Sequence, residues 1–202
     1  AELKGLAGQI GSAESLMSGL GFGSGRCGVI LADDPDDLAA ALKDQAPAAP
    51  KGAAYMPQGD KRTNIRAALA HLHEAAPAPV DTIPLSAGAA FGNVKVDVPG
   101  CTICLACVGA CPTGALMDNP DLPQLSFQEE ACVQCGICQA TCPEKVIRLE
   151  PRFNFTMAAR QAVVVKEEQP FNCVRCGKPF GTKSAIERVT RQLANKHAMF
   201  RS

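Results

Sequence analysis

The sequence CTICLACVGACP at residues 101–112 is repeated as CVQCGICQATCP at residues 132–143. Both copies read Cys-x-x-Cys-x-x-Cys-x-x-x-Cys-Pro at an offset of 31 residues, and they hold eight of the eleven cysteines. This spacing is typical of two [4Fe–4S] clusters in which each copy gives its fourth cysteine to the other copy's cluster. The repeat therefore predicts two iron–sulfur clusters bound by one folded unit.

The spacing also predicts which cysteines bind together. The first set is Cys101, Cys104, Cys107 and Cys142, and the second set is Cys132, Cys135, Cys138 and Cys111. Three residues after the third cysteine complete about one helical turn. The proline that follows biases the fourth cysteine away from the helical region, so its thiolate should point to the neighbouring cluster.

Other interpretations of the cysteines fit less well. A disulfide framework requires an oxidising compartment, and the N-terminal sequence has no export signal. Two structural zinc sites would not require the proline or the crossed spacing. The Cys-x-x-x-Cys-x-x-Cys pattern of radical enzymes fails, because Gly114 and Lys145 stand where the third cysteine of that pattern would be.

The 202 residues are enough for one or two compact domains. No run of apolar residues is long enough to span a membrane. Reduced thiolates and cluster assembly favour a cytoplasmic location. The sequence opens without a methionine, which suggests a piece of a longer chain.

The formal net charge of zero is unevenly distributed. Residues 1–92 carry 7 basic and 10 acidic side chains, residues 93–165 carry 5 and 7, and residues 166–202 carry 8 and 3. A negative cluster-bearing part beside a positive tail suggests oriented docking onto a redox partner. The alternative is that the basic tail is an ordinary solvated helix face.

The chain divides by pattern into three parts, and the first, residues 1–92, is predicted to be a small α/β region or a fragment of a domain. The apolar run at residues 28–32 predicts a strand, and the acids and proline at residues 33–36 predict a helix start. Residues 45–59 form an alanine- and proline-rich connection. The apolar spacing at residues 61–75 predicts an amphipathic helix.

Two other features of this first part carry weaker signals. The glycines at residues 19–25 follow a predicted helix and precede a strand, which reverses the order of a dinucleotide-binding loop, so we expect a flexible loop. Cys27 is expected to be a small buried hydrophobe. His71 and His73 are expected to be surface or capping residues.

The second part, residues 93–158, carries the repeat on a predicted antiparallel β scaffold. Residues 94–98 alternate apolar and polar side chains, residues 115–127 can pair as a hairpin, and residues 146–149 supply a matching strand. The repetition predicts two short helices related by a pseudo-twofold axis. The expected class is α+β.

The third part, residues 159–202, contains Cys173-Val-Arg-Cys176 followed by Gly177. Two thiolates in a tight turn form half of a tetrahedral zinc site. The candidates for the remaining ligands within the chain are Cys27, His71, His73 and His197, none at a familiar spacing. The simplest expectation is zinc at this pair with a second ligand pair from beyond Ser202, and the alternative is a zinc site completed by these candidates within the chain.

A helix should follow the cysteine pair, with Ser184 and Glu187 as a capping box. Its apolar face would hold Ile186, Val189, Thr190 and Leu193, and its basic face Arg188, Arg191 and Lys196. A zinc knuckle with a basic helix can contact nucleic acid. Aromatic residues do not interleave with these basic residues, so we do not expect nucleic-acid binding.

The segment from CTICLACVGACPTGAL to CVQCGICQATCPEKVI resembles the bacterial two-[4Fe–4S] ferredoxin family over roughly residues 93–155. It matches at all eight cysteines and both prolines. The resemblance implies the ferredoxin βαββαβ fold and one-electron transfer, that is, a ferredoxin-like dicluster module preceded by the α/β region and followed by the helix-bearing CxxC tail.

More of the chain resembles the C-terminal part of larger ferredoxin-type iron–sulfur proteins with a CxxC tail. The segments that carry this likeness are KRTNIRAALAHL, IPLSAGAAFG and CVRCGKPFGTKSAIERV. The likeness implies a formate-type oxidoreductase as partner. The second cysteine pair expected in such tails is absent from this sequence, which puts the metal site of the tail in doubt.

The function predicted from these patterns is electron transfer through two [4Fe–4S] clusters, as a cytoplasmic carrier or subunit of an oxidoreductase system. No acid–base pair, nucleophile–base set or open metal position is evident, so we do not expect an enzyme with its own substrate. The alternative is a non-catalytic accessory or maturation protein that binds a redox-enzyme client.

Overall fold

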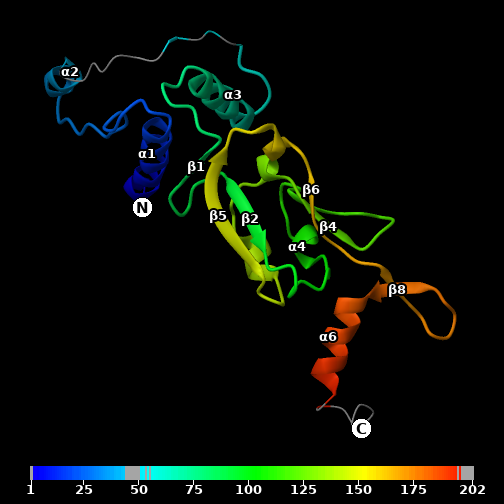
Figure 1. The fold of residues 1–202 in the computed structure, drawn as a ribbon. Coiled ribbons are helices and arrows are strands. Elements are labelled where there is room, and N and C mark those ends of the chain that lie inside the picture. Colours follow the sequence, from blue (N-terminus) through cyan, green and yellow to red (C-terminus); the bar gives the residue numbers. More distant parts are fainter. Residues whose placement is uncertain (1, 44–50, 53, 55, 195, 197–202) are drawn as a thin grey trace. The chain divides into compact units, whose positions relative to one another are not determined.

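The fold is described from a computed structural model that covers residues 2–43, 51–52, 54, 56–194 and 196 (Figure 1). Contacts divide the chain into two compact units, Ala1–Ala89 with Arg152–Thr156, and Ala90–Pro151 with Met157–Ser202. The three-part division by sequence pattern stays a prediction. Much of the predicted connection at residues 45–59 lies outside the described residues.

The first unit is mostly helical. Its elements are α1 (Glu2–Gly19), α2 (Pro35–Lys43), α3 (Lys61–Glu74) and β1 (Thr82–Pro84). Asp34 begins α2, because its carboxylate accepts hydrogen bonds from the backbone N–H groups of Asp36 and Asp37. Asp60 caps α3 in the same way through Thr63 N at 2.8 Å. Both predicted helices are confirmed.

The predicted strand at residues 28–32 is wrong. These residues form no strand, and Val29, Ile30 and Leu31 are 50%, 37% and 84% exposed. An apolar run becomes a strand only when a neighbour accepts its backbone hydrogen bonds. In the described part of this unit, β1 pairs instead with the last residues of β5 (Ile147–Asn154), from Thr82↔Asn154 to Pro84↔Arg152.

The glycine-rich segment that precedes this run is folded over Glu14 of α1. The Glu14 carboxylate accepts hydrogen bonds from the backbone N–H groups of Gly25, Arg26 and Cys27. Cys27 is half-buried and lies outside the core, whereas the sequence predicts a small buried hydrophobe. Burial raises its pKa, and the nearby Glu14 carboxylate adds to the effect.

The histidines of α3 make local contacts. His71 Nε2 lies 3.0 Å from the carbonyl oxygen of Lys51, and His73 Nε2 lies 3.0 Å from that of Val80. His73 also stacks on Phe155, with 4.3 Å between ring centroids.

The second unit contains the cysteine repeat on short strands and helices. Its elements are β2 (Gly92–Val96), α4 (Ala106–Gly109), β3 (Leu116–Asp118), β4 (Gln124–Phe127), η1 (Glu129–Ala131), α5 (Ile137–Thr141), β5 (Ile147–Asn154), η2 (Met157–Arg160), β6 (Val163–Glu167), β7 (Pro170–Asn172), β8 (Pro179–Thr182) and α6 (Lys183–Leu193). β2 pairs antiparallel with β5. β4 pairs with both β3 and β6, and β7 pairs with β8.

The strands predicted around the cysteine loops are confirmed with small shifts. Val94 lies opposite Leu149, but the first strand ends at Val96, so Val98 is 40% exposed instead of half-buried in a strand. The hairpin turns where expected, since Asn119 Oδ1 accepts a hydrogen bond from Asp121 N. The core of this unit forms around the buried cysteines and includes Val94, Leu116, Leu125, Phe127 and Ile147.

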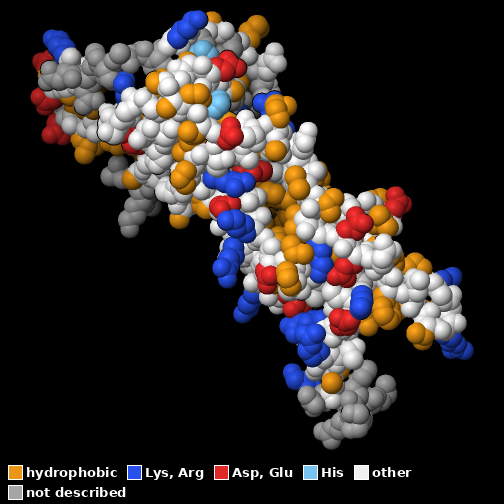
Figure 2. All heavy atoms as spheres, in the orientation of Figure 1, with side chains coloured by type: hydrophobic (Ala, Val, Ile, Leu, Met, Phe, Trp, Pro, Cys, Tyr) orange, Lys and Arg blue, Asp and Glu red, His pale blue; other side chains and the backbone are white. Residues whose placement is uncertain are grey.

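The N-cap of the last helix lies two residues before Ser184, the N-cap of the predicted capping box. Thr182 is the N-cap, and its Oγ1 accepts a hydrogen bond from Ala185 N at 3.1 Å. The prediction of a box between Ser184 and Glu187 is therefore wrong. Ser184 lies inside α6 and contacts Glu168 instead. Lys and Arg side chains gather around α6 on the face shown in Figure 2.

Candidate metal centre

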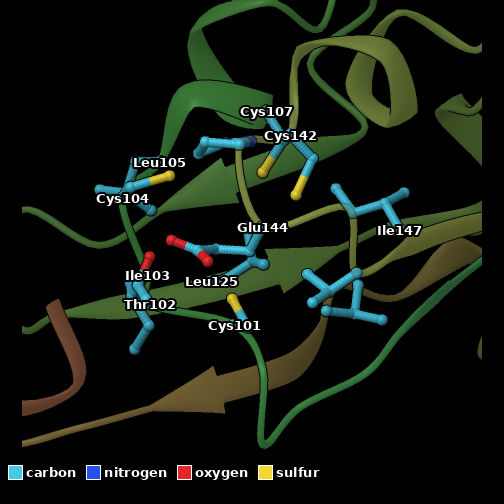
Figure 3. Close-up of a pocket in the computed structure, with 13 residues that line it drawn as sticks. Cys101, Thr102, Ile103, Cys104, Leu105, Cys107, Leu125, Cys142, Glu144 and Ile147 are labelled. Carbon is cyan, nitrogen blue, oxygen red and sulfur yellow. The ribbon is translucent and has the colours of Figure 1, made fainter. Parts of the chain in front are cut away.

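Two cavities of similar size lie in the second unit, each lined by four cysteines. They enclose about 350 and about 320 Å³, including their open mouths. The cysteines of the first cavity are Cys101, Cys104, Cys107 and Cys142, and those of the second cavity are Cys111, Cys132, Cys135 and Cys138. In Figure 3 the four sulfur atoms of the first cavity point into the space between them.

The structure thus brings together the same two sets of cysteines that the spacing predicts. Each cavity takes three cysteines from one copy of the repeat and the fourth from the other copy. Cys142 leaves the end of α5 with extended backbone angles, φ −64° and ψ 114°, directly before Pro143. The proline therefore ends the helix at the fourth cysteine, as expected. The ligation itself stays a prediction.

The backbone of the two loops repeats a strained pattern. Positive φ angles occur at Ile103 and Gln134, and again at Leu105 and Gly136, which are equivalent positions at the 31-residue offset. A left-handed conformation costs a residue with a side chain roughly 1–3 kcal/mol. The rest of the fold must offset this cost, and the conformation lets successive backbone N–H groups turn toward one concave side.

Backbone N–H groups accordingly act on the sulfur atoms. Burial raises the pKa of Cys101, and the Ile103 N–H partly opposes it. Burial also tends to raise the pKa of Cys111, but the N–H groups of Leu116 and Thr113 outweigh it and hold that pKa below its usual value. Donors of this kind stabilise negative charge on a cluster thiolate.

At Cys107 the effect of burial on the thiol pKa dominates. Burial, together with the neighbouring Cys101 and Cys104 thiols, raises the pKa of Cys107 to about 11. Four cysteine sulfurs around one cavity suit a group that brings positive iron to all of them at once. Within the described residues, no three His, Cys, Asp or Glu side chains converge on the position of a single metal ion. Four cysteines spaced around each cavity suit a group larger than one ion, as a cubane cluster is.

Two residues that contact these cysteine loops were not predicted from the sequence. Gln134 is buried, and its Nε2 donates hydrogen bonds to Asn93 O at 2.9 Å and to Cys132 Sγ at 3.4 Å. The signal in the sequence is an amide in the second copy where the first copy has Ile103. Lys166 contacts the carbonyl oxygen of Cys101. It lies 65 residues further along the chain, so no local pattern indicates it.

The Cys173 and Cys176 pair lies in the turn between β7 and β8. Gly177 N donates to Cys173 O at 2.8 Å, and Gly177 has φ +72°. The backbone N–H groups of Arg175 and Cys176 hold the pKa of Cys173 below its usual value. Among described residues the structure brings no third ligand candidate to this pair, and His197 lies outside them.

Comparison with known protein families identifies the cysteine-rich region. A family described as a 4Fe-4S dicluster domain matches residues 100–147. This range contains both copies of the repeat.

Curated proteins that are similar to this chain are subunits of oxidoreductases. The chain is 44% identical to the polyferredoxin-like subunit of an aliphatic sulfonate oxidoreductase from Pyrococcus furiosus, over 21% of this chain. It is 40% identical to a subunit of an ion-translocating oxidoreductase complex from Methanosarcina acetivorans, over 25% of this chain. It is 32% identical to the formate dehydrogenase-O iron-sulfur subunit of Escherichia coli, over 46% of this chain. The chain spans 25%, 18% and 33% of the lengths of these relatives.

Together these findings define a mixed helix-and-strand protein with a 4Fe-4S dicluster domain. The relatives named above are subunits of oxidoreductases, and together with the dicluster domain they support electron transfer by the cysteine-rich region. None of the described helices is long and apolar enough to cross a membrane.

Proposed function

We propose that the chain binds two [4Fe–4S] clusters, one in each cavity, and relays single electrons between them as a subunit or carrier. The observation that carries this proposal is the crossed lining of the two cavities, each by three cysteines of one copy and the fourth of the other. When bound, the clusters supply one-electron redox chemistry. The residues of the chain hold the clusters, shield them with apolar side chains and donate N–H groups to the sulfurs.

The arrangement of elements supports the ferredoxin-like form of this proposal. The second unit runs β2, α4, β3, β4, α5, β5, which is the order βαββαβ, with η1 inserted before α5. The positive φ at Gly114 and Lys145 adds a further pair of equivalent positions at the same offset. We propose that a pseudo-twofold axis relates the halves, as in the bacterial two-cluster ferredoxins.

We propose no substrate site for this chain. Four cysteines per cluster would occupy every iron of a cubane, which leaves no open position for Lewis-acid chemistry. The partner would be a redox protein or an oxidoreductase subunit, for example of the formate type, because each relative named above is a subunit or component of an oxidoreductase. None of the eleven cysteines forms a disulfide, and cysteines kept available for clusters suit a reducing compartment such as the cytoplasm.

Repeated redox cycling of the cluster-loaded chain tests this proposal. We expect anaerobic dithionite to bleach the visible absorbance and a mild oxidising dye to restore it over several cycles without loss of iron. The Cys107→Ala variant is the control, because it removes a buried ligand of the first cavity. Clusters that never reduce, in a chain that binds an oxidoreductase tightly, would replace the electron relay with the accessory role.

We also propose that Cys173 and Cys176 supply half of the ligands of a zinc site. The turn between β7 and β8 supports this, since backbone N–H groups already face the Cys173 sulfur. Phe171 and Phe180 pack edge to face at 5.6 Å across the base of the turn. Zinc quantitation on the chain and on its Cys173→Ser variant tests the proposal. Equal zinc content in the two proteins would show that this pair binds no zinc in this chain.

A further inference from the structure

The two cysteine-lined cavities differ in charge. The second cavity is lined by apolar and neutral side chains from Val94 to Leu149, with no charged residue among them. The first cavity includes Glu144 in its lining (Figure 3), and the ammonium group of Lys166 contacts the carbonyl oxygen of its ligand Cys101. The repeat in the sequence therefore encodes two similar loops in two different electrostatic settings.

Lys166 reaches the first loop through an irregularity in the sheet. Leu125 pairs with Lys166 while Ser126 pairs with Val164, so one residue of β6 is extra at this point. A bulge of this kind re-aims the side chains that follow it. The Lys166 side chain is only 10% exposed, and its Nζ lies 2.7 Å from the Glu168 carboxylate, which is 18% exposed.

Glu168 in turn is held by the first turn of α6. Its Oε2 accepts hydrogen bonds from Ser184 N at 3.1 Å and from Ser184 Oγ at 2.9 Å. Although burial opposes it, the contacts with Lys166 and Ser184 hold the pKa of Glu168 below its usual value. The carboxylate therefore stays charged near neutral pH.

Two further contacts join the tail to the first loop. The Thr182 hydroxyl donates to the carbonyl oxygen of Thr102 at 2.9 Å, and both residues are buried. Arg188 Nε lies 2.7 Å from the carboxylate of Glu144, the residue that follows Cys142 and Pro143. The helix α6 is thus fastened to both segments that supply ligands to the first cavity.

Buried charges act on a redox centre because the local dielectric constant is low. Adding an electron makes the cluster site more negative. A nearby positive charge stabilises the reduced form and raises the midpoint potential, and a negative charge lowers it. We propose that Lys166 and Glu168 tune the midpoint potential of the first cluster in opposite directions, so that the tail sets the first cluster apart from the second. This inference rests on the proposed two-cluster function.

Midpoint potentials of both clusters, measured by EPR during redox titration of the full chain, test the inference. We expect Lys166→Met to lower the potential of one cluster and Glu168→Gln to raise the potential of that same cluster. The double variant should fall between the two. The other cluster should shift less in each case. Gln134→Leu identifies which EPR signal belongs to the other cluster, because Gln134 contacts a cysteine of the second cavity and its loss should shift the potential of that cluster.

Thr182→Val is the matched control, since it loosens the attachment of α6 without changing charge. Shifts of Lys166→Met and Glu168→Gln in the same direction, or equal to that of Thr182→Val, would mean that the pair acts only by holding the tail in place. Unchanged potentials in both variants would also overturn the inference. If circular dichroism shows that Lys166→Met does not fold, the midpoint potential of Glu168→Gln alone decides, and the inference requires that it rise. Failure of the unsubstituted chain to hold two reducible clusters would instead reject the proposed function.

Discussion

The two cysteine loops share a backbone and differ in their surroundings. Both turn through left-handed residues at the same positions, Ile103 with Leu105 and Gln134 with Gly136. The first loop is contacted by residues of the C-terminal tail, and the second is contacted by β2 through Gln134. The comparison teaches that the sequence repeat fixes the backbone of the two cysteine loops, whereas residues that the repeat does not share give each loop its own surroundings.

The largest expected difference between the two cysteine loops is in which cavity loses its iron when one crossed cysteine is replaced. Cys142→Ala should empty the first cavity and Cys111→Ala the second, each with loss of about half of the iron or more. Loss can exceed half because metal binding is coupled to folding. Iron and sulfide quantitation checks this, with Cys27→Ala, which leaves both cavities intact, as the control. Full iron content in either ligand variant would break the assignment of the two sets.

A second difference concerns how tightly the strands approach the second loop. A Cβ at Gly92 would lie 2.5 Å from Glu150 O and 2.6 Å from Gln134 Cδ. Gly92→Ala should therefore lower the unfolding free energy by about 1–3 kcal/mol through overpacking. Gly109→Ala in α4 is the control, because nothing lies within 4 Å of its added Cβ. Denaturant unfolding of the two variants measures the difference, and equal stability would contradict the close approach.

The side chain at the repeated left-handed position sharpens the comparison further. Gln134→Leu removes the N–H donor to Cys132 Sγ and with it a buried acceptor, Oε1, that has no partner. The variant should stay folded and lower the potential of the second cluster, because N–H donors to sulfur favour the reduced form. Ile103→Leu at the equivalent position should leave both potentials unchanged. EPR-monitored titration of the two variants separates these outcomes.

The smallest expected effect lies at the tail. Thr182→Val removes the N-cap of α6 and the donor to Thr102 O, at a cost of about 1–2 kcal/mol. Glu187→Gln removes the exposed pair with Lys183, 3.8 Å apart, and should cost less than about 0.5 kcal/mol. Hydrogen exchange of the α6 amides reports both. Greater loss of protection in the Glu187 variant would contradict this ranking.

Much of the second unit could be predicted from sequence, because the ligand spacing and the alternation of residues 94–96 are local signals. The strand expected at residues 28–32 could not be excluded, since a strand depends on a partner elsewhere in the chain. The cap at Thr182 was missed because Ser184 and Glu187 fit the same motif. Lys166 and Glu168 could not be found, because their position depends on a bulge in β6.

The central claim is that one folded unit holds two clusters through crossed cysteine sets. Anaerobic EPR of the fully reduced chain, combined with iron quantitation, tests it most directly. We predict about eight irons per chain and a spectrum of two magnetically interacting reduced clusters. About four irons with the spectrum of a single isolated cluster would contradict the claim.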